Sequence, residues 1–222
     1  MSAPLSTVRR ADCPWCGGRR LRSRSAVLDR CQECAHVFRN PRVAVGGRRV
    51  RDRPRRYRAT VRAVLRLRRP DPESWLDVGT GDAGFPAAAR AFFPYTAFDG
   101  LDVSPRVLRA RAAERIEEAH LGRLTDPHVT APLRSRYDVV SLLDHLPHTP
   151  TPQADLIAAL TLLRPGGLLI LELPTPTNWR PPPPPPNITT ALTTQGCTLL
   201  SPTLHSLLSP TYHLLAHTPH PN

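Results

Sequence analysis

The sequence predicts a parallel α/β domain preceded by a small zinc ribbon. Two Cys-x-x-Cys pairs lie near the N-terminus, and from residue 71 onward short apolar runs alternate with helical stretches, the first run entering a glycine-rich loop. Such alternation is typical of a parallel sheet covered by helices. We therefore divide the chain into a zinc ribbon at residues 1–45, a basic linker helix at 46–70 and an α/β domain at 71–222.

Length and composition exclude several classes of protein. The chain has 222 residues, of which 40% are hydrophobic, so it can bury the core of one domain with a small appendage. Global disorder and a long multidomain assembly are excluded. The first residues lack the apolar segment of a signal peptide, and no run approaches the roughly 20 apolar residues that span a bilayer. We expect a cytoplasmic protein with no membrane partner.

Charge is distributed unevenly along the chain. Residues 1–70 carry 20 Arg and 4 acidic residues, a net charge of +16, whereas residues 71–222 carry 10 Arg and 14 acidic residues, a net charge of −4. A chain-wide bias toward arginine explains the absence of lysine but not this split. The N-terminal third therefore has nucleic acid as a candidate partner. A solvated, arginine-rich face is the alternative explanation.

The cysteine spacing is the strongest local signal. Cys13 and Cys16 form one pair and Cys31 and Cys34 the other, with fourteen residues between the pairs. Two such knuckles can hold four thiolates at ~2.3 Å from one Zn²⁺, and the segment between them can form a short hairpin. Because four protein ligands leave no open position, this zinc would stabilise a fold and perform no chemistry. The alternatives are disulfides, which a chain without a secretion signal disfavours, redox thiols, and vestigial cysteines.

Three further expectations concern the residues around and after the ribbon. His36 follows the second pair and is expected to be an exposed loop histidine, although it could replace a cysteine ligand. Cys197, in an apolar stretch, is expected in the core. Between the ribbon and the α/β domain, Tyr57, Val61 and Val64 recur among arginines at helical spacing, which predicts one basic amphipathic helix. This helix would dock the ribbon or guide an anionic substrate.

The first part of the α/β domain predicts a ligand site. Residues 74–78 form an apolar strand, residues 79–84 a glycine loop and residues 85–93 an alanine-rich helix. Glycines let a ligand approach the backbone, and the helix N-terminus offers free amides. A second strand at 96–103 ends near Asp102, whose carboxylate can accept both ribose hydroxyls of an adenosine-containing ligand. A helix follows from Ser104 to about Ala119.

Asp77 distinguishes between two adenosine-containing cofactors. The loop Gly79-x-Gly81-x-x-Gly84 satisfies the dinucleotide fingerprint, so the glycines alone do not separate NAD from other ligands. A carboxylate two residues before the first glycine would repel the phosphates of a dinucleotide. It would attract a sulfonium with a free amino group.

At these residues the chain resembles the class I S-adenosylmethionine-dependent methyltransferases, and specifically those with an N-terminal zinc-binding ribbon. The resemblance implies a Rossmann-like, seven-stranded methyltransferase sheet, S-adenosylmethionine as cofactor and a structural Zn²⁺. Asp77, Gly79 and Gly81 would then surround the methionine part of the cofactor, and Asp102 would hold its ribose. The likeness rests on Cys13-Pro-Trp-Cys16-Gly17 and on residues 30–42, 76–81, 100–105, 137–140 and 163–169.

The chain departs from the family pattern in the ribbon and in the cofactor-binding segments. Ala35 stands where the second knuckle usually has glycine, and Ala83 stands where the third glycine of the loop is expected. The acidic residue that usually meets the adenine amino group is poorly defined. Asp126 is the candidate, with an ordinary turn aspartate before Pro127 as the alternative.

The loop after the strand at 138–143 holds the candidate catalytic residues. His148 aligns with the histidine of the family's Asp-x-x-Glu-His motif and Asp144 with its aspartate, whereas Pro147 stands where glutamate is usual. A histidine at this edge of the sheet could accept a proton from the attacking nucleophile. His145 is the second candidate, and a structural loop histidine is the alternative.

The C-terminal part is expected to complete the sheet. A strand at 167–173 precedes a proline-rich stretch in which residues 181–186 are six consecutive prolines, a predicted polyproline spacer. A helix at 188–195 and strands at 197–205 and 211–217 would follow, as the family's terminal hairpin requires.

These features predict a methyltransferase that moves a methyl group from S-adenosylmethionine to a small-molecule acceptor, because the ribbon resembles that of relatives acting on small metabolites. The ribbon would be structural or would position the substrate. One alternative is an RNA methyltransferase. The other, favoured by the basic N-terminal third and the missing glutamate, is a nonenzymatic zinc-ribbon protein that binds nucleic acid and carries a decayed catalytic domain.

Overall fold

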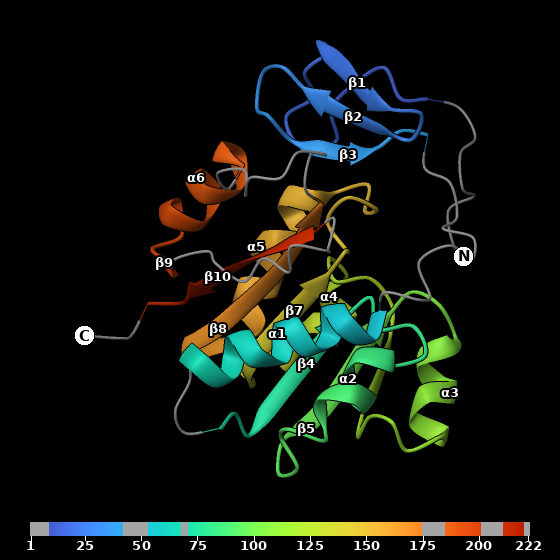
Figure 1. Cartoon of the computed structure of the whole chain (residues 1–222), viewed down its shortest axis with the longest axis vertical. Helices are drawn as coiled ribbons and strands as arrows, with labels where there is room; N and C mark the ends of the chain where they lie inside the picture. The colour runs from blue at the N-terminus through green and yellow to red at the C-terminus, as the bar shows by residue number, and fades with distance from the viewer. Residues whose placement is uncertain (1–8, 42–52, 68–70, 175–184, 201–210, 220–222) are drawn as a thin grey trace.

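The computed structural model describes residues 9–41, 53–67, 71–174, 185–200 and 211–219. These residues form a three-stranded sheet and a seven-stranded sheet, and Figure 1 shows the smaller sheet as a separate layer at one end of the molecule. The predicted Rossmann-like, seven-stranded α/β sheet is confirmed. No helix of the described segments is both long enough and apolar enough to cross a membrane.

The small sheet is antiparallel and has a very small core. Phe38 packs with Cys13 and Cys31, and Trp15 and Leu21 lie partly buried beside them. A core of this size cannot hold a fold alone, so such units depend on a metal or disulfides. The strands are β1 (Leu21–Ser25), β2 (Leu28–Cys31) and β3 (Val37–Arg39), in the order β1-β2-β3.

The large sheet has the order β6-β5-β4-β7-β8-β10-β9. Its first five strands in this order run parallel, whereas β10 is antiparallel to both β8 and β9. The strands are β4 (Ser74–Val78), β5 (Ala97–Asp102), β6 (Ala119–Leu121), β7 (Tyr137–Leu143), β8 (Leu163–Pro174), β9 (Thr198–Leu200) and β10 (Thr211–His217).

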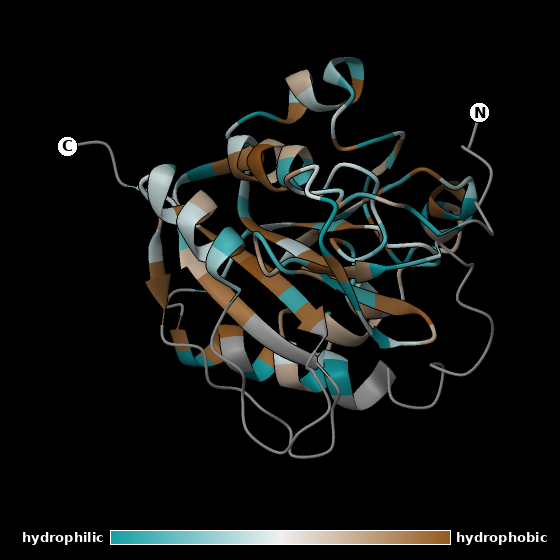
Figure 2. Cartoon of the chain, turned by 90° about the horizontal axis from the view of Figure 1, so that it is seen from above, coloured by the Kyte–Doolittle hydropathy of each residue, from teal (hydrophilic) through white to brown (hydrophobic). Residues whose placement is uncertain are grey.

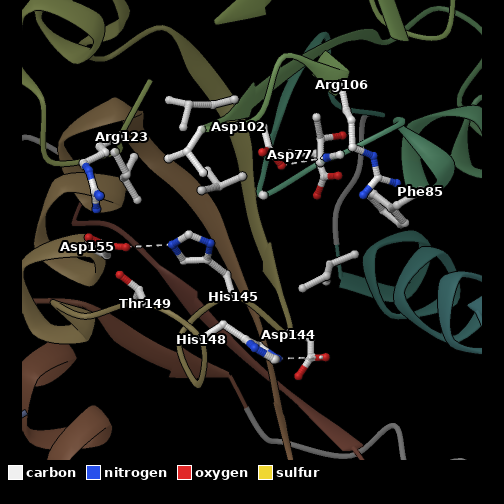
Figure 3. Close-up of a pocket in the computed structure, with 18 of the residues that line it drawn as sticks. Asp77, Phe85, Asp102, Arg106, Arg123, Asp144, His145, His148, Thr149 and Asp155 are labelled. Carbon is white, nitrogen blue, oxygen red and sulfur yellow. Dashed lines mark hydrogen bonds and ion pairs between the residues drawn. The ribbon is translucent and has the colours of Figure 1, made fainter. Parts of the chain in front are cut away.

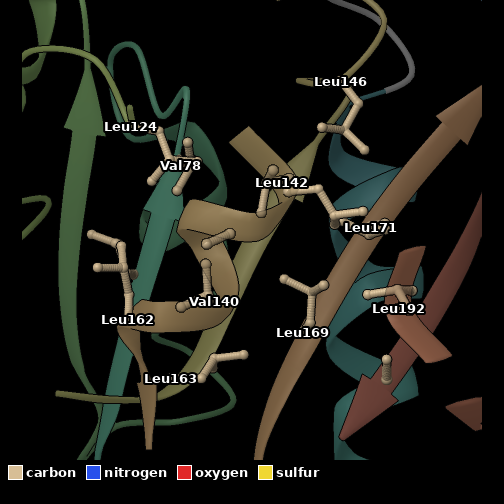
Figure 4. Close-up of a cluster of buried hydrophobic side chains, with 14 of the residues drawn as sticks. Val78, Leu124, Val140, Leu142, Leu146, Leu162, Leu163, Leu169, Leu171 and Leu192 are labelled. Carbon is tan, nitrogen blue, oxygen red and sulfur yellow. The ribbon is translucent and has the colours of Figure 1, made fainter. Parts of the chain in front are cut away.

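Helices cover both faces of this sheet, which explains why its central strands are almost continuously apolar. On β8, Leu168 and Ile170 belong to one buried cluster and Leu169 and Leu171 to the other, so alternate side chains serve opposite faces. Figure 2 shows hydrophobic residues along the central strands, and Figure 4 shows the cluster against α5. One face carries α1 (Arg53–Leu67), α2 (Gly84–Ala89) and α3 (Arg106–Ala112), and the other α4 (Pro127–Thr130), the 3₁₀ turn η1 (Ala131–Leu133), α5 (Pro152–Leu162) and α6 (Pro186–Thr194).

The predicted basic helix is present as α1. Its apolar residues Val61 and Val64 are buried in the same cluster as α2 residues, so α1 is fastened to the α/β domain. Arg56 departs from the expectation of a solvated arginine face, because it is buried and pairs with Glu172 of β8. The rest of the predicted linker segment, at 46–52 and 68–70, lies outside the described residues.

Several predicted element ends are wrong. The helix expected at 85–93 ends at Ala89, a few residues before Pro94, which cannot continue a helix. The helix expected to reach Ala119 ends at Ala112, because the chain turns at Glu114, with φ 55°, to enter β6. Pro186 is the first residue of α6, so the predicted spacer does not extend that far. Residues 181–184 and 201–210, which belong to the predicted spacer and strand, lie outside the described residues.

The two alanines that replace family glycines adopt glycine-like conformations. Ala35 has φ 61° and Ala83 has φ 54°. A side chain in this left-handed region costs roughly 1–2 kcal/mol. The turns that the family builds with glycine are therefore formed here with alanine and at a cost in stability.

Two single-residue expectations have opposite outcomes. Cys197 is buried, as predicted. The expectation of an exposed His36 is wrong, because it is only 2% exposed and its ring lies between those of Trp15 and Phe38. This aromatic stack holds the imidazole inside the contact between the ribbon and α6, where the Asn187 side chain lies 3.4 Å from His36 Nδ1.

Candidate functional site

A cleft of about 740 Å³ lies at the carboxyl ends of β4, β5 and β7. This edge is where ligands bind in open α/β sheets. Six of the predicted cofactor or catalytic residues line the cleft, together with Tyr57 of α1, and Figure 3 shows several of them facing one another. The six predicted residues are Asp77, Gly79, Gly81, Asp102, His145 and His148.

The glycine loop requires glycine at two positions. Gly79 has φ 74° and Gly81 has φ 57°, a region that residues with side chains rarely adopt. A Cβ atom on Gly79 would lie 3.1 Å from His145 Nδ1, so a larger residue there would crowd the cleft. The amide of Gly79 donates to the carbonyl of Leu101 at 2.7 Å, which fixes the loop against the end of β5.

Asp102 joins the two loops that follow β4 and β5. Its Oδ2 accepts from the amide of Gly81 at 2.8 Å, and its Oδ1 accepts from the amide of Ser104 at 2.7 Å. A carboxylate has about four lone-pair sites, so about two remain for further donors. The carboxylate therefore fits the two hydroxyls of a ribose, the role that the family resemblance implies.

Asp77 is a buried carboxyl group on the floor of the cleft. Its Oδ1 accepts from Ser141 Oγ at 2.7 Å, and Ser141 Oγ accepts in turn from Trp75 Nε1 at 3.0 Å. Burial raises the pKa of Asp77 to about 7, although the hydrogen bond from Ser141 acts in the opposite direction. A cationic group bound beside it would favour the ionised form. The site therefore suits the ammonium and sulfonium charges of S-adenosylmethionine.

His145 is held by an acidic residue that the sequence analysis did not single out. Its Nε2 lies 2.7 Å from Oδ2 of Asp155, in the first turn of α5, and the hydroxyl of Thr151 donates to Oδ1 of Asp155 at 3.1 Å. Burial is the largest single influence and acts to raise the pKa of Asp155, but the hydrogen bond and charge of His145 and the threonine hydroxyls together hold the pKa below its ordinary value. A signal was present: Thr151-Pro152 marks a helix start, where a carboxylate is favoured.

His148 is contacted from the ribbon. Arg39 of β3 places its Nε 3.1 Å from His148 Nε2, and its backbone amide donates to the carbonyl of Pro147 at 3.1 Å. Asp144 Oδ2 lies 3.5 Å from the same imidazole nitrogen. Arg39 is buried, and no sequence signal distinguishes it from the other N-terminal arginines. The ribbon therefore contacts the loop that carries both candidate catalytic histidines.

The structure does not bring Asp126 to the cleft. Its carboxylate caps α4 by accepting from the amide of His128 at 3.0 Å. The cleft is lined at this point by Arg123 and Thr125. Capping, the alternative role of a turn aspartate, accounts for this residue.

The four ribbon cysteines are arranged as zinc ligands would be. All are free thiols, and their sulfur atoms lie within 4.8 Å of one another, with 3.6 Å between Cys13 and Cys34 and 3.7 Å between Cys16 and Cys31. A tetrahedron with ligands at ~2.3 Å from zinc has edges of ~3.8 Å, whereas a disulfide would need ~2.05 Å. Amides of Trp15, Gly18 and Glu33 point at the sulfurs at 3.4 Å, and these N–H donors stabilise thiolates. The residues therefore fit Zn²⁺.

Comparison with known proteins identifies the family. A sequence model described as a methyltransferase domain matches residues 49–219. The chain belongs to the class I S-adenosylmethionine-dependent methyltransferases. The resemblance drawn from the motifs is thereby confirmed, and the ribbon cysteines precede the matched region.

Solved methyltransferases share the fold at low sequence identity. An O-methyltransferase family protein from Burkholderia thailandensis is 17% identical with a TM-score of 0.57, over 76% of this chain and 58% of its own. The chain thus spans little more than half of that protein. The magnesium protoporphyrin IX methyltransferase of Synechocystis PCC 6803, solved with S-adenosylhomocysteine, is 15% identical with a TM-score of 0.59, over 75% of this chain and 83% of its own. A search of curated proteins returned no match.

The buried carboxyl group of Asp77 predicts a pH-dependent stability. Its ordinary pKa is 3.8 and burial raises it to about 7, so between these values the folded protein holds a proton that the unfolded chain has released. The contribution of Asp77 to the free energy of unfolding therefore falls with rising pH in this interval, by up to about 1.4 kcal/mol for each pH unit. Asp77→Asn keeps an oxygen acceptor for Ser141 but cannot titrate. Urea unfolding across this interval gives the free energy of unfolding of the wild type minus that of Asp77→Asn, which should fall as pH rises. If this quantity stays constant or increases with pH, the pKa of Asp77 is not raised.

The bonds of Asp102 predict a loss of cofactor affinity in Asp102→Ala. The variant removes the acceptor for two ribose hydroxyls and for the amides of Gly81 and Ser104. Charge-assisted hydrogen bonds are worth about 1.5–3 kcal/mol each, so affinity for S-adenosylhomocysteine should fall roughly tenfold or more. Calorimetric titration checks this, with Asp126→Ala as the matched control that keeps its affinity within about twofold. Equal affinities of the two variants would remove Asp102 from the cofactor site.

Proposed function

We propose that this methyltransferase transfers the methyl group of S-adenosylmethionine to a small-molecule acceptor and that its N-terminal domain is a zinc ribbon. One observation carries the proposal: the residues suited to the cofactor and the two imidazoles of the loop after β7 line one cleft of about 740 Å³. Pockets of this size hold small molecules. The cleft has room for the cofactor and for an acceptor of limited size beside it.

The residues of the cleft divide into two groups by position. Asp102 would hold the ribose, and Asp77 with the backbone at Gly79 and Gly81 would hold the methionine part. The cofactor supplies a methyl group that its sulfonium charge already activates. The protein mainly has to align the acceptor with that group, and alignment alone lowers such barriers greatly. His145, His148 and Thr149 line the part of the cleft formed by the loop after β7, where we place the acceptor.

The similar structures support a small acceptor without choosing its chemistry. Their names include a magnesium protoporphyrin IX methyltransferase, an N-acetylserotonin methyltransferase and an N-methyltransferase from Bradyrhizobium japonicum WM9. Each name describes the activity of that protein and does not identify the acceptor of this one. O-, N- and C-methylation all occur among them, so the fold does not decide which atom of the acceptor receives the methyl group.

The ribbon would stabilise its own fold and would also position the part of the cleft where we place the acceptor. Zn²⁺ would replace the missing hydrophobic core around Phe38, and β3 would thereby be held in place. Because Arg39 on β3 contacts His148 and Pro147, the ribbon would fix the loop on the acceptor side of the cleft. This combines the structural and substrate-positioning roles predicted from the sequence.

One observation favours the two alternative functions predicted from the sequence. The net charge of +16 over residues 1–70 favours an RNA methyltransferase or a nucleic-acid-binding protein with a decayed catalytic domain. Against decay, every cofactor residue predicted at the ends of β4 and β5 lines the cleft. Two of the basic residues, Arg39 and Arg56, are buried and engaged within the protein. A cytoplasmic location stays a prediction of the sequence.

Transfer of labelled methyl groups tests the proposed function. The zinc-loaded protein is incubated with S-adenosylmethionine carrying a radioactive methyl group, together with either a dialysable metabolite fraction or total RNA. We expect label in dialysable products and none in RNA, and Asp102→Ala should weaken the signal at subsaturating S-adenosylmethionine because its affinity for the cofactor is lower. Label in RNA, with RNA affinity falling steeply as salt rises, would establish the RNA alternative instead.

The thiol geometry predicts one zinc ion per chain. The double variant Cys13→Ser/Cys31→Ser removes two ligands and should lose the metal, whereas the control Cys197→Ser leaves the four ribbon thiols intact and should retain it. Affinity for S-adenosylhomocysteine should stay within a few-fold, since the cofactor residues belong to the large sheet. Metal analysis and amide hydrogen exchange check this. Unchanged protection of β1 to β3 without metal would contradict a zinc-dependent ribbon.

A further inference from the structure

The two imidazoles of the cleft, those of His145 and His148, differ in which ring nitrogen is free to accept a proton. An arginine side chain is always protonated and can only donate, so His148 Nε2 accepts from Arg39 Nε in the 3.1 Å contact. A neutral imidazole has one acceptor nitrogen. Asp144 Oδ2 lies farther from the same nitrogen, at 3.5 Å, so the Arg39 contact sets the tautomer. His148 in this arrangement therefore carries its hydrogen on Nδ1, and its lone pair is already used by the ribbon.

His145 has the opposite arrangement. Asp155 is a carboxylate with a lowered pKa and can only accept, so His145 Nε2, at 2.7 Å, carries the hydrogen. The lone pair then lies on Nδ1. That nitrogen faces the glycine loop, because a Cβ atom built on Gly79 would lie 3.1 Å from it, and Figure 3 shows the ring between Asp155 and the cofactor residues.

Asp155 is fixed well enough to hold the ring in one orientation. It is buried at 5% exposure, it receives the Thr151 hydroxyl, and its own amide donates to the Thr151 carbonyl at 2.9 Å. A buried carboxylate that accepts from one imidazole nitrogen sets the tautomer and stabilises the imidazolium that forms when the other nitrogen takes a proton. This arrangement is that of an oriented general base.

We propose that His145, oriented by Asp155, is the general base of this methyltransferase and that the acceptor atom is a hydroxyl oxygen. The inference rests on the proposed function and reverses the order of the two histidines predicted from the sequence. An amine already offers a lone pair to a methyl group, whereas a hydroxyl is a weak nucleophile until its proton leaves. A base prepared in this way therefore serves an acceptor that carries a hydroxyl group.

The acceptor hydroxyl gives its proton to His145 Nδ1 while its oxygen forms a bond to the methyl carbon. The carbon–sulfur bond breaks, and its electron pair stays on sulfur. The products are a methyl ether, a neutral thioether and the imidazolium of His145 paired with Asp155. The proton then returns to solvent through the open cleft.

The charged groups around His145 favour this proton transfer. Five carboxyl groups from β4, the loop after β4, β5, the loop after β7 and α5 share the cleft with its ring, and the Asp155 carboxylate is in direct contact. The cations that line the same cleft, apart from His148, are arginines, and two of them, Arg56 and Arg106, pair with Glu172 and Asp82. The titratable and charged groups that line the cleft with His145 are Asp77, Asp82, Asp102, Asp144, Asp155, His148, Tyr57, Arg56, Arg106, Arg115 and Arg123.

Nuclear magnetic resonance tests the base without knowledge of the acceptor. Long-range proton–nitrogen spectra of the zinc-loaded protein, recorded with and without S-adenosylhomocysteine, report which nitrogen of each imidazole carries hydrogen. We expect hydrogen on Nε2 of His145 and on Nδ1 of His148, and Asp155→Asn should change the pattern of His145 alone. Hydrogen on Nδ1 of neutral His145 would overturn the proposal. Spectra showing that this Nδ1 accepts a hydrogen bond from bound S-adenosylhomocysteine would also overturn it.

The chemistry of the labelled product tests the acceptor class. In the methyl-transfer assay, the dialysable product should carry label in a methyl ether. His145→Ala should lower its rate of formation by on the order of 10² to 10⁴ and remove the rise of rate with pH, while S-adenosylhomocysteine affinity stays within a few-fold. His128→Ala, an exposed histidine on α4, is the control that keeps the rate. Label on nitrogen or carbon would overturn the hydroxyl assignment. No label in any fraction would refute the proposed function, and the spectra would still decide the role of His145.

Discussion

The structure depends most on the carboxylate of Asp102, which ties together the loops that follow β4 and β5. Its two oxygens accept from the amides of Gly81 and Ser104, so the glycine loop and the start of α3 take their positions from one side chain. Parallel strands end at the same edge of a sheet, and this edge becomes a cleft because the loops diverge there. Once the loops are fixed, Gly79 lies against His145, and the cofactor side and acceptor side of the cleft are adjacent.

The ribbon and the methyltransferase sheet meet at the part of this cleft formed by the loop after β7. Arg39 contacts His148 and Pro147, while α6 packs beside the ring of His36. A metal held by the four ribbon cysteines would therefore also stabilise the position of a cleft histidine, although these cysteines lie outside the cleft. A closed zinc site of this kind would matter for activity without chemistry of its own.

Short sequence motifs predicted the parts of the site whose residues lie close together along the chain. The strand at residues 74–78, the glycine loop and Asp102 follow one another within a short segment, and the cysteine spacing is likewise local. Buried contacts between distant segments were not predictable in the same way, whereas Asp155, ten residues after His145 at a helix start, had a local signal. Arg39 is 109 residues from His148, and Arg56 is 116 residues from Glu172, so only tertiary packing brings them together. Helix ends failed for a related reason, since the pairing of β6 with β5 decides where α3 stops.

An experimental structure of the zinc-loaded protein with S-adenosylhomocysteine tests the central claim most directly. The account predicts that both ribose hydroxyls lie within hydrogen-bond distance of Asp102, that the amino group of the ligand lies beside Asp77, and that its sulfur lies on the side of the cleft that His145 Nδ1 faces. A ribose turned away from Asp102, or a ligand bound outside the edge formed by β4, β5 and β7, would contradict it.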